Sequence, residues 1–512
     1  MKNFKRMVAI VVTLAMTAAL LGACGSKSKS TGEKKGESSR DSLVIGMAAE
    51  ISTLDPHMHS NIGTANLMLA IFESLLTHDF VTDEIKPGLA ESYEVSEDGM
   101  TIDMTLRTDF KFHNGDPVTM EDVLYSMERT MESAFQNVFW DAVDNVEAVD
   151  DTHLRFNLNQ PDNNLPYYIA DFANIVPKAV VEADPDGFAR APIGCGPYKF
   201  VNWSQGMQID MEADPNYPDG EAPIKNVTWR FITDRSTALV ALETGEVDAF
   251  MTMNGADFDQ IRNTEGLTLK TVSGNNTYYL SLNMEDEVLS NDKVREAICL
   301  AIDKKSVIDG AEYGEAKIAD HGFIREGQVG YSDNFKEAER DVERGKALLA
   351  EAGYANGLSL ELKCQSSKTT HAQVIQANLK EIGIDVEIVQ LENSAFYADL
   401  ENGDFQMEFG GFGQYTPDPS STFRYVYRSD GVMAGNYYRL NSPEIDELLA
   451  RGEVSTDPEE RQKIYEEVIQ LVEDAHCCKY IYWPTANIAH NSDLKGVEAT
   501  PVGEYDIYNY YW

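Results

Sequence analysis

Segments with the periodicity of a strand alternate with segments of helical periodicity along this chain, and this alternation constrains its fold more than any other feature. Residues 101–106 carry an apolar side chain at every second position, as a half-buried strand does. Residues 374–382 have a helical pattern that stops at Gly383, and a second alternating run follows at residues 384–388. A chain built from such units is predicted to adopt an α/β fold.

Several helix ends can be predicted from capping residues. Thr119 followed by Asp122 is typical of a helix start, and so is Asp457 directly before Pro458. An apolar helical pattern also runs to Gly353, which favours a C-terminal stop there. We therefore expect helices to begin after Thr119 and after Asp457, and a helix to end before Gly353.

The N-terminus has the pattern of a secretory signal. A short basic region precedes an uncharged, mostly apolar run over residues 7–21. This run is shorter than the roughly 20 apolar residues of a membrane-spanning helix. It leads to Leu-Gly-Ala directly before Cys24, which resembles a bacterial lipobox. The resemblance implies that residues 1–23 are a lipoprotein signal peptide and that Cys24 is lipidated, whereas an ordinary signal peptide with an incidental cysteine is the alternative.

The segment after the signal differs from the rest of the chain. Residues 24–40 are rich in Ser, Gly, Lys and Glu and contain no aliphatic residue, which predicts a flexible tether. The body from Asp41 to Trp512 is longer than one hydrophobic core usually covers, so we expect two or three lobes. No later segment is long and apolar enough to span a membrane.

The charge balance excludes one large class of partners. The chain has 85 Asp and Glu residues against 42 Lys and Arg residues, a net charge of −43. Nucleic-acid phosphates attract basic surfaces, so we expect no nucleic-acid partner. The acidity is better explained by solubility.

The cysteines other than Cys24 show neither a CxxC pair nor the spacing of a zinc site. An oxidising exterior permits disulfides, but an odd number of thiols cannot all pair within one chain. We expect these side chains to be small buried hydrophobic groups. They are Cys195, Cys299, Cys364, Cys477 and Cys478.

Catalytic motifs are missing from the sequence. It contains no Gly-x-Ser-x-Gly, no His-Glu-x-x-His and no phosphate-binding Gly-rich loop before a Lys. A pair of carboxylates could serve a hydrolase, but pairs of acids are unremarkable in so acidic a chain. We expect a binding protein rather than an enzyme.

One stretch of the body resembles a known family. The matching runs are Leu89-Ala90-Glu91-Ser92-Tyr93, Ser96-Glu97-Asp98-Gly99-Met100, Leu106-Arg107, Phe110-Lys111-Phe112-His113-Asn114-Gly115-Asp116-Pro117-Val118-Thr119 and Glu121-Asp122-Val123. Together they resemble the signature of the family 5 extracellular solute-binding proteins, the peptide, nickel and related receptors of ABC importers. Shorter matches extend the resemblance from about Asp41 to Trp512. They include Gly194-Cys195-Gly196-Pro197-Tyr198, Leu242-Glu243-Thr244-Gly245-Glu246-Val247-Asp248 and Val294-Arg295-Glu296-Ala297.

The resemblance implies an α/β, two-lobed, periplasmic-binding-protein-like clamp with an extra domain inserted in the first lobe. Two hinge crossovers would join the lobes, and the ligand would be buried between them on closure. The implied division is residues 41–72, 194–276 and 484–512 for lobe I, residues 73–193 for the inserted domain, and residues 277–483 for lobe II.

The resemblance also points to a wall of the ligand site in residues 410–419. Gly411 lets backbone approach a ligand closely, and Phe412 and Tyr415 offer flat apolar faces. Phe412 stands where the family usually has Trp. The alternative is a buried turn that packs Phe412 into the lobe core. Tyr278, which precedes the second lobe, is a further candidate contact near a hinge.

Two departures from the family bear on the ligand. Dipeptide-binding members place an Asp three residues before the Asp-Pro, where this chain has Tyr415. They also carry an Arg for the ligand carboxylate after the lobe II strand, where this chain has Cys364-Gln365-Ser366-Ser367-Lys368. Because a buried charge needs a partner, losing both anchors argues against free dipeptides. Longer peptides remain open, and so do oligosaccharides that stack on aromatic rings.

The first loop of the body is the second candidate region. His57 and Met58 are expected to lie near an organic ligand, since the family's equivalent loop borders the cleft. His57 and His59 could also suit nickel, because imidazole binds that metal well. No third ligand is apparent, so we expect no metal site.

We therefore expect an extracytoplasmic lipoprotein, held at the outer face of the cell membrane by Cys24. It would capture a peptide or peptide-like solute, without a cofactor, and deliver it to the permease and ATPase subunits of an ABC importer. An oligosaccharide or a nickel chelate is the alternative ligand. A surface receptor that senses solute without transport is the alternative function.

Overall fold

A computed structural model describes residues 40–59, 61–431 and 435–512. Cys24, the signal peptide and all of the tether except Arg40 lie outside the described residues. The helices of the described part include none that is long and apolar enough to cross a membrane.

One mixed sheet of 12 strands extends through the body, in the order β16-β15-β17-β13-β18-β11-β1-β10-β9-β8, with β12 and β14 also paired to β18. The pairs β1–β10, β1–β11, β15–β16 and β15–β17 are parallel, and the other pairs are antiparallel. The strands are β1 (Ser42–Met47), β8 (Tyr198–Ser204), β9 (Gln208–Ala213), β10 (Asn226–Phe231), β11 (Ala249–Met251), β12 (Leu267–Ser273), β13 (Asn276–Leu282), β14 (Ala316–Ile318), β15 (Leu358–Gln365), β16 (Ile384–Leu391), β17 (Met407–Gly413) and β18 (Cys478–Asn491).

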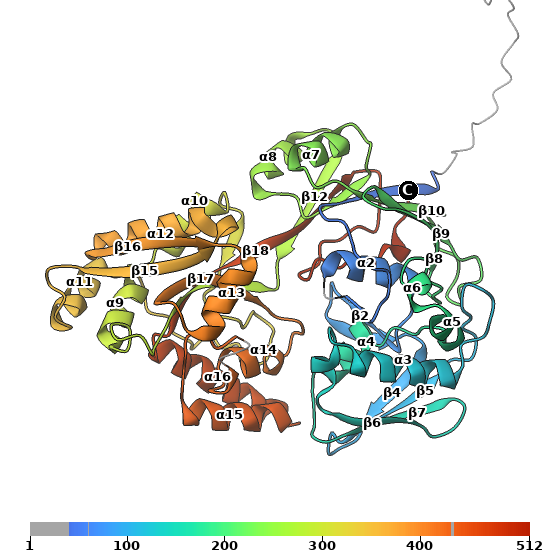
Figure 1. Cartoon of the computed structure of the whole chain (residues 1–512), viewed down its shortest axis with the longest axis horizontal. Helices are drawn as coiled ribbons and strands as arrows, with labels where there is room; N and C mark the ends of the chain where they lie inside the picture. The colour runs from blue at the N-terminus through green and yellow to red at the C-terminus, as the bar shows by residue number, and fades with distance from the viewer. Residues whose placement is uncertain (1–39, 60, 432–434) are drawn as a thin grey trace, which may run out of the picture. The chain divides into compact units, whose positions relative to one another are not determined.

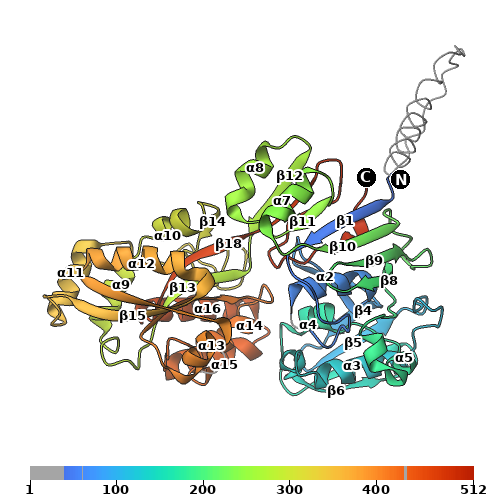
Figure 2. The ribbon, with the colours of Figure 1, turned by 45° about the horizontal axis from the view of Figure 1, so that its top comes forward.

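The long strand β18 lies in the middle of this sheet and pairs with strands of both halves. Its first part pairs with β13 and β14, and its second part pairs with β12 and β11. In Figure 2, β18 runs from beside β13 to beside β11 and β12. The short segment between β12 and β13 is a second connection between the two halves of the sheet. We call β1 and the strands β8 to β12 the first lobe, and the strands β13 to β17 the second lobe.

Helices cover both faces of the first-lobe strands. The helix α2 and the C-terminal segment pack on one face through residues such as Leu67, Ile71 and Tyr505. The helices α7 and α8 pack on the other face around Phe250 and Phe258. These helices are α2 (Ile62–Ile71), α7 (Arg235–Glu243) and α8 (Phe258–Asn263).

The second-lobe strands are also covered on both faces (Figure 1). Four helices share one apolar cluster with the strands, and three others share a second cluster that is rich in tyrosine. The short α13 packs through Phe396 and Leu400. The first four are α9 (Asp292–Ala301), α10 (Lys304–Ala311), α11 (Val342–Glu351) and α12 (Thr369–Glu381), followed in the chain by α13 (Asn393–Asn402), and the other three are α14 (Ser420–Val426), α15 (Pro443–Val454) and α16 (Pro458–Asp474).

The segment from β2 to α6, here called the insert, has its own apolar cluster and its own four-stranded antiparallel sheet, β4-β5-β7-β6. Its strands are β2 (Leu76–Asp79), β3 (Glu84–Pro87), β4 (Ala90–Val95), β5 (Thr101–Leu106), β6 (Val143–Ala148) and β7 (His153–Leu158). Its helices are α3 (Met120–Glu132), α4 (Leu165–Phe172), α5 (Lys178–Ala183) and α6 (Pro185–Phe188). Short 3-10 turns, in the insert and elsewhere, are η1 (Asn137–Trp140), η2 (Gly255–Asp257), η3 (Ser366–Lys368) and η5 (Ile507–Asn509).

The local predictions agree with the elements observed. Thr119 and Asp122 form a reciprocal capping box at the start of α3, and Asp457 caps α16 with Pro458 in its first turn. The predicted helix before Gly383 is α12, and Gly383 has a φ of 91°, which a residue without Cβ adopts at no steric cost. The five cysteines expected to be buried are all buried, and they are free thiols.

Candidate binding site

Three adjoining cavities lie near the connections between the lobes, and β18 lines two of them. The middle one, the hinge cavity, has a volume of about 400 Å³. Both connections between the lobes contribute to its wall, residues 274–276 from one and residues 484–487 from the other, together with Tyr278. A molecule in this cavity would therefore contact the segments about which the lobes would turn.

Tyr278 is held in the hinge cavity by its neighbours on the sheet. Its ring stacks on Tyr482, with ring centroids 4.8 Å apart and an angle of 14° between the planes. On the neighbouring strand, Gly411 leaves room for the ring, because a Cβ at that position would lie 2.9 Å from Cδ1 of Tyr278. The Nζ atom of Lys368 lies 4.0 Å from the centroid of the Tyr278 ring, a cation–π contact.

Lys368 also lines the second cavity, the charged cavity, which has a volume of about 440 Å³. Its Nζ atom lies 3.6 Å from a carboxylate oxygen of Glu312. The same carboxylate accepts a hydrogen bond from Tyr482, at 2.7 Å, and lies 2.7 Å from Nε2 of His371. Although burial raises the pKa of Glu312, the contacts with His371 and Lys368 outweigh it and lower that pKa. The ammonium group of Lys368 thus lies at the wall of this cavity, where it contacts Glu312 and the hydroxyl of Tyr482.

The third cavity, the aromatic pocket, has a volume of about 150 Å³. Its wall combines the first lobe, the insert and Tyr415 from the segment after β17. The Tyr415 side chain is 54% exposed, and its ring lies edge-on to Phe139 with centroids 5.5 Å apart. Phe139 in turn stacks on Phe172 at 4.2 Å. The rings that line this pocket are Phe80, Phe135, Phe139, Phe172 and Tyr415.

The expected wall residue Phe412 lies at the border of the second-lobe core. Its ring centroid is 6.3 Å from that of Phe323 and 6.4 Å from that of Tyr425. The side chain is partly buried against the tyrosine-rich cluster. Contact between Phe412 and a ligand stays a prediction.

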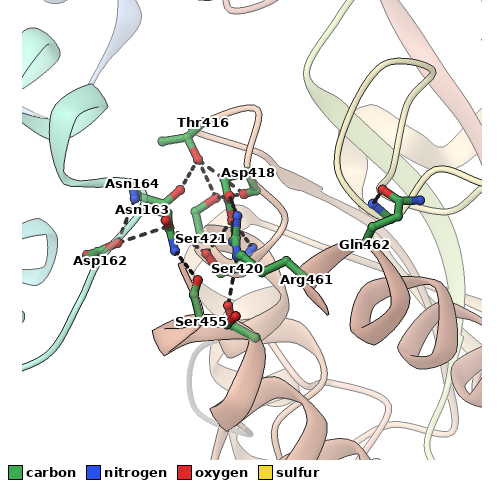
Figure 3. Close-up of polar contacts among 12 residues, drawn as sticks. Asp162, Asn163, Asn164, Thr416, Asp418, Ser420, Ser421, Ser455, Arg461 and Gln462 are labelled. Carbon is green, nitrogen blue, oxygen red and sulfur yellow. Dashed lines mark hydrogen bonds and ion pairs between the residues drawn. The ribbon is translucent and has the colours of Figure 1, made fainter. Parts of the chain in front are cut away.

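A set of buried polar contacts joins the insert to the second lobe (Figure 3). Asn164 donates a hydrogen bond to the hydroxyl of Ser420 at 2.8 Å and accepts one from Thr416. Asp418 holds this turn, because its carboxylate accepts from the Ser420 hydroxyl and pairs with Arg461 at 2.6 Å. Asn164, Thr416 and Ser420 are each less than 5% exposed, so these bonds are shielded from water. We call them the rim contacts.

Comparison with known proteins identifies the kind of molecule that carries this site. The sequence model described as bacterial extracellular solute-binding proteins, family 5 Middle, matches residues 84–434. The chain belongs to this family. Members of the family are substrate-binding transport proteins that act outside the cytoplasm.

Individual relatives match almost the whole of this solute-binding protein. The oligopeptide-binding protein AppA of Bacillus subtilis is 27% identical, over 99% of this chain and 98% of that protein. The structure of HbpA2 from Haemophilus parasuis is 25% identical with a TM-score of 0.83, over 92% of this chain and 99% of that one. The structure of DppA from Helicobacter pylori with the peptide STSA is 27% identical with a TM-score of 0.77, over 92% and 98% of the two chains. The two-lobed α/β fold predicted from the sequence is thereby confirmed.

His57 lies inside the solute-binding protein rather than on a cavity wall. Its Nδ1 atom lies 2.9 Å from Arg129, which pairs with Asp55, and its Nε2 atom lies 2.9 Å from the carbonyl oxygen of Asn174. Burial and the neighbouring Arg129 lower the pKa of His57 to about 4, so the imidazole is neutral. A neutral ring that accepts from Arg129 donates its Nε2–H to Asn174. Both ring nitrogens are thus used by the protein, and Met58 beside it is 46% exposed.

The cavities contain side chains that the sequence patterns did not single out for ligand binding. Lys368 lies in the segment where dipeptide-binding members of the family carry an Arg for the ligand carboxylate. A basic residue in that segment could have indicated its role. Phe139 gave no such signal, because its contact with Tyr415 depends on tertiary packing. Asn164, which belongs to the rim contacts outside these cavities, gave none either, because Thr416 and Ser420 are distant in the sequence. In the part of the chain that the structure describes, no cluster of three or more His, Cys, Asp or Glu side chains is arranged to hold a metal ion.

Proposed function

We propose that this protein captures a peptide or peptide-like solute outside the cytoplasm and delivers it to the permease and ATPase subunits of an ABC importer. The similarity to an oligopeptide-binding protein and to a peptide-bound DppA supports this class of ligand. The protein itself carries out no catalysis in this proposal.

The observation that carries the proposal is the free edge of β17 beside Tyr278. On one side, β17 pairs with β13 along its whole length. On the other side, β15 pairs only with Met407 to Phe409, and no further strand of the described residues continues beyond that point. The backbone of residues 410–413, which includes three glycines and is partly exposed, therefore has no strand partner on that side among the described residues. Extended peptides bind to such edges through main-chain hydrogen bonds.

The charged cavity supplies a second contact for such a ligand. In this proposal the ammonium group of Lys368, 3.6 Å from Glu312, receives a carboxylate of the solute. A charge-assisted hydrogen bond of this kind is stronger than a neutral one. Phe412 and Tyr415 provide apolar contacts on the second-lobe side.

A ligand screen by thermal unfolding tests the proposal, with protein that lacks residues 1–24. Peptides of two to six residues, oligosaccharides and nickel chelates are tested in parallel. A peptide at about 100 times its dissociation constant stabilises the fold by about 2.7 kcal/mol. Stabilisation by sugars or chelates alone would overturn the peptide assignment, and mass spectrometry that finds cleaved peptide would overturn the binding-only role.

The variant Phe412→Ala tests whether Phe412 contacts the ligand. We expect it to weaken the peptide found in the screen by more than about tenfold, or about 1.4 kcal/mol, while the protein stays folded. An unchanged affinity would remove Phe412 from the site. Peptide uptake in cells that lack the protein distinguishes import from sensing. Loss of uptake would support import.

We also propose that Cys24 is lipidated and anchors the protein to the outer face of the membrane. The Leu-Gly-Ala-Cys sequence after the apolar run supports this. Cys24→Ala is expected to move the protein from the membrane fraction to the soluble fraction. A variant that stays in the membrane fraction would contradict the anchor.

The division into domains is proposed as residues 41–72, 194–276 and 484–512 for lobe I, residues 73–193 for the inserted domain, and residues 277–483 for lobe II. The apolar cluster around the sheet of β4 to β7 and the cluster of the second lobe support it, whereas Val176, Val181 and Phe188 of the inserted segment pack into the first-lobe cluster. Limited proteolysis that cuts near residues 73 and 193, and near the two crossovers, is the expected result.

A further inference from the structure

The aromatic pocket has acidic groups on its wall but no basic one. Asp171 and Glu504 both line it, and none of the lining residues in the described chain is a Lys or an Arg. Its other polar lining residues are neutral amides, His59 and Tyr415. The balance of charge at this pocket therefore depends on groups just behind its wall.

One of the two acids already has a partner. The Asp171 carboxylate lies 3.2 Å from Nδ1 of His78, whose side chain is 2% exposed. Asp83 lies 3.5 Å from the other ring nitrogen of the same histidine. Although burial opposes the charge, the hydrogen bonds with Asp171 and Asp83 raise the pKa of His78 to about 9. A single imidazolium is thus shared by the carboxylates of Asp171 and Asp83.

The backbone around the other acid, Glu504, is held by hydrogen bonds, whereas its carboxylate has no partner among the described residues. Its carbonyl oxygen accepts from Thr500 at 2.7 Å, and the next amide donates to Asn66 at 2.8 Å. Among the described residues, the Glu504 carboxylate makes neither a hydrogen bond nor an ion pair. Burial and the nearby Asp171 raise the pKa of Glu504 to about 8. An unpaired carboxylate in such a place gains stability from any cation that reaches it.

His59 provides a second, independent observation. Its side chain lines the same pocket and is 9% exposed, and its Nδ1 atom is buried with no hydrogen-bond partner in the described structure. Burial lowers the pKa of His59 to about 4, so the ring is neutral. In the neutral ring that carries its proton on Nε2, the Nδ1 atom accepts a hydrogen bond from an N–H group of a ligand.

The walls are suited to a cation as well. Phe139, Phe172 and Tyr415 form a continuous set of ring contacts beside the acids. Ring faces attract ammonium and guanidinium groups, by about 2 kcal/mol or more where water is excluded. The volume of about 150 Å³ exceeds the roughly 10–15 Å³ that one water molecule needs.

We propose that the aromatic pocket binds a positively charged group of the solute, a primary ammonium or a guanidinium, between its rings and the carboxylates of Glu504 and Asp171. The inference rests on the proposed solute capture and specifies the class of solute. An apolar side chain in the same place would leave Glu504 without a partner, which disfavours it.

Calorimetric titration of protein lacking residues 1–24 tests the inference with matched probes. The probes are pentapeptides that carry one lysine or, at the same position, one Nε-acetyl-lysine, together with agmatine as a cation that is not a peptide. We expect the lysine peptide to bind at least about tenfold more tightly than the acetylated one. Glu504→Gln is expected to abolish this preference and to leave the affinity for the acetylated peptide within about twofold.

Glu498→Gln is the control, because Glu498 is an exposed acid of the same segment, paired with Lys270 outside the pocket. It should retain the full preference for the lysine peptide. His59→Phe is a second variant, expected to reduce the preference by removing the acceptor nitrogen while the ring is kept.

The outcomes separate the inference from the proposed function. If both peptides bind equally and Glu504→Gln has no effect, the cation site is wrong while peptide capture stands. If no peptide binds but agmatine does, and Glu504→Gln removes that binding, the cation site stands while peptide capture fails. If neither a peptide nor agmatine shows a dependence on Glu504, the inference is overturned.

Discussion

At the scale of single residues, Gly411 sets the position of an aromatic ring in the hinge cavity. A Cβ at Gly411 would lie 2.9 and 3.0 Å from two carbon atoms of the Tyr278 ring and 3.1 Å from the carbonyl oxygen of Thr277. Gly411→Ala therefore displaces Tyr278 and costs about 1–3 kcal/mol of stability through overpacking. We expect the affinity for the captured solute to fall by about tenfold in a calorimetric titration.

A double-mutant cycle shows whether this effect passes through the ring. In the Tyr278→Ala background the clash with the ring is absent, so Gly411→Ala should change the affinity much less than in the native protein. Equal effects in both backgrounds would mean that Gly411 acts on the ligand by another route.

The protonation of Glu504 makes binding of a cation depend on pH. Without a bound cation this side chain takes up a proton below about pH 8, because burial and Asp171 raise its pKa. A cation favours the carboxylate, so binding releases a proton and strengthens as the pH rises. We expect the affinity for the lysine peptide to increase from pH 6 to about pH 8, by up to about tenfold per unit, and then to level off.

Calorimetric titrations between pH 6 and pH 9 check this expectation. The lysine side chain stays protonated over that range, since its pKa is about 10.4. The charged groups that face Glu504 are Asp171 and His78. Glu504→Gln should remove the dependence below pH 8, and an equally steep dependence in that variant would assign it to one of these neighbours.

At the scale of elements, the N-terminus of α4 joins the insert to the second lobe. Asn164 occupies the N-cap position but makes no capping hydrogen bond with its side chain. Its amide instead bonds Thr416 and Ser420 of the second lobe. Asn164→Ala should therefore weaken the contact between the regions more than the helix itself. We expect the solute to dissociate about tenfold faster, because the loss of two buried hydrogen bonds costs about 1–3 kcal/mol.

Asn291→Ala is the matched control for this prediction. Asn291 also stands at an N-cap, but its side chain accepts from the backbone N–H of Lys293 in α9, as a capping residue normally does. The control should lower the stability by about 1 kcal/mol and leave the dissociation rate unchanged. Stopped-flow dissociation and thermal unfolding measure the two quantities, and equal dissociation rates for both variants would exclude a role of the rim contacts in retaining the solute.

The elements themselves were largely predictable, because their signals are local. Thr119 and Asp122 lie within one turn, and Gly383 follows the C-cap residue of the helix that it ends, so the sequence alone specifies these boundaries. The site was less predictable, because it depends on register between distant strands. Tyr278 stacks on Tyr482 only because β13 pairs with β18 in this register, and a shift of one strand by one residue would place the two rings on opposite faces of the sheet. The partners of His57 are likewise set by tertiary packing.

At the scale of the whole molecule, the two lobes share one sheet. Because β18 pairs with strands of both lobes, a change in its twist alters the hinge cavity and both lobes together. Both connections also line that cavity. A solute bound there therefore contacts the segments that set the relation between the lobes, which is the arrangement that hinge closure requires.

The charge of the whole molecule should act on the approach of a cationic solute before any contact forms. The chain has a net charge of −43, and the Debye length falls from about 30 Å at 0.01 M salt to about 8 Å at 0.15 M. The field that attracts a cation toward the cleft is therefore screened by salt. We expect the association rate of the lysine peptide to fall by about tenfold between 10 and 300 mM sodium chloride, and that of the acetyl-lysine peptide by less than about twofold.

Stopped-flow tyrosine fluorescence measures both rates. Because Glu504 acts only after the solute has arrived, Glu504→Gln should retain most of the salt dependence while its dissociation rate rises. Equal salt dependence for the charged and the neutral peptide would show that the molecular charge plays no part in capture.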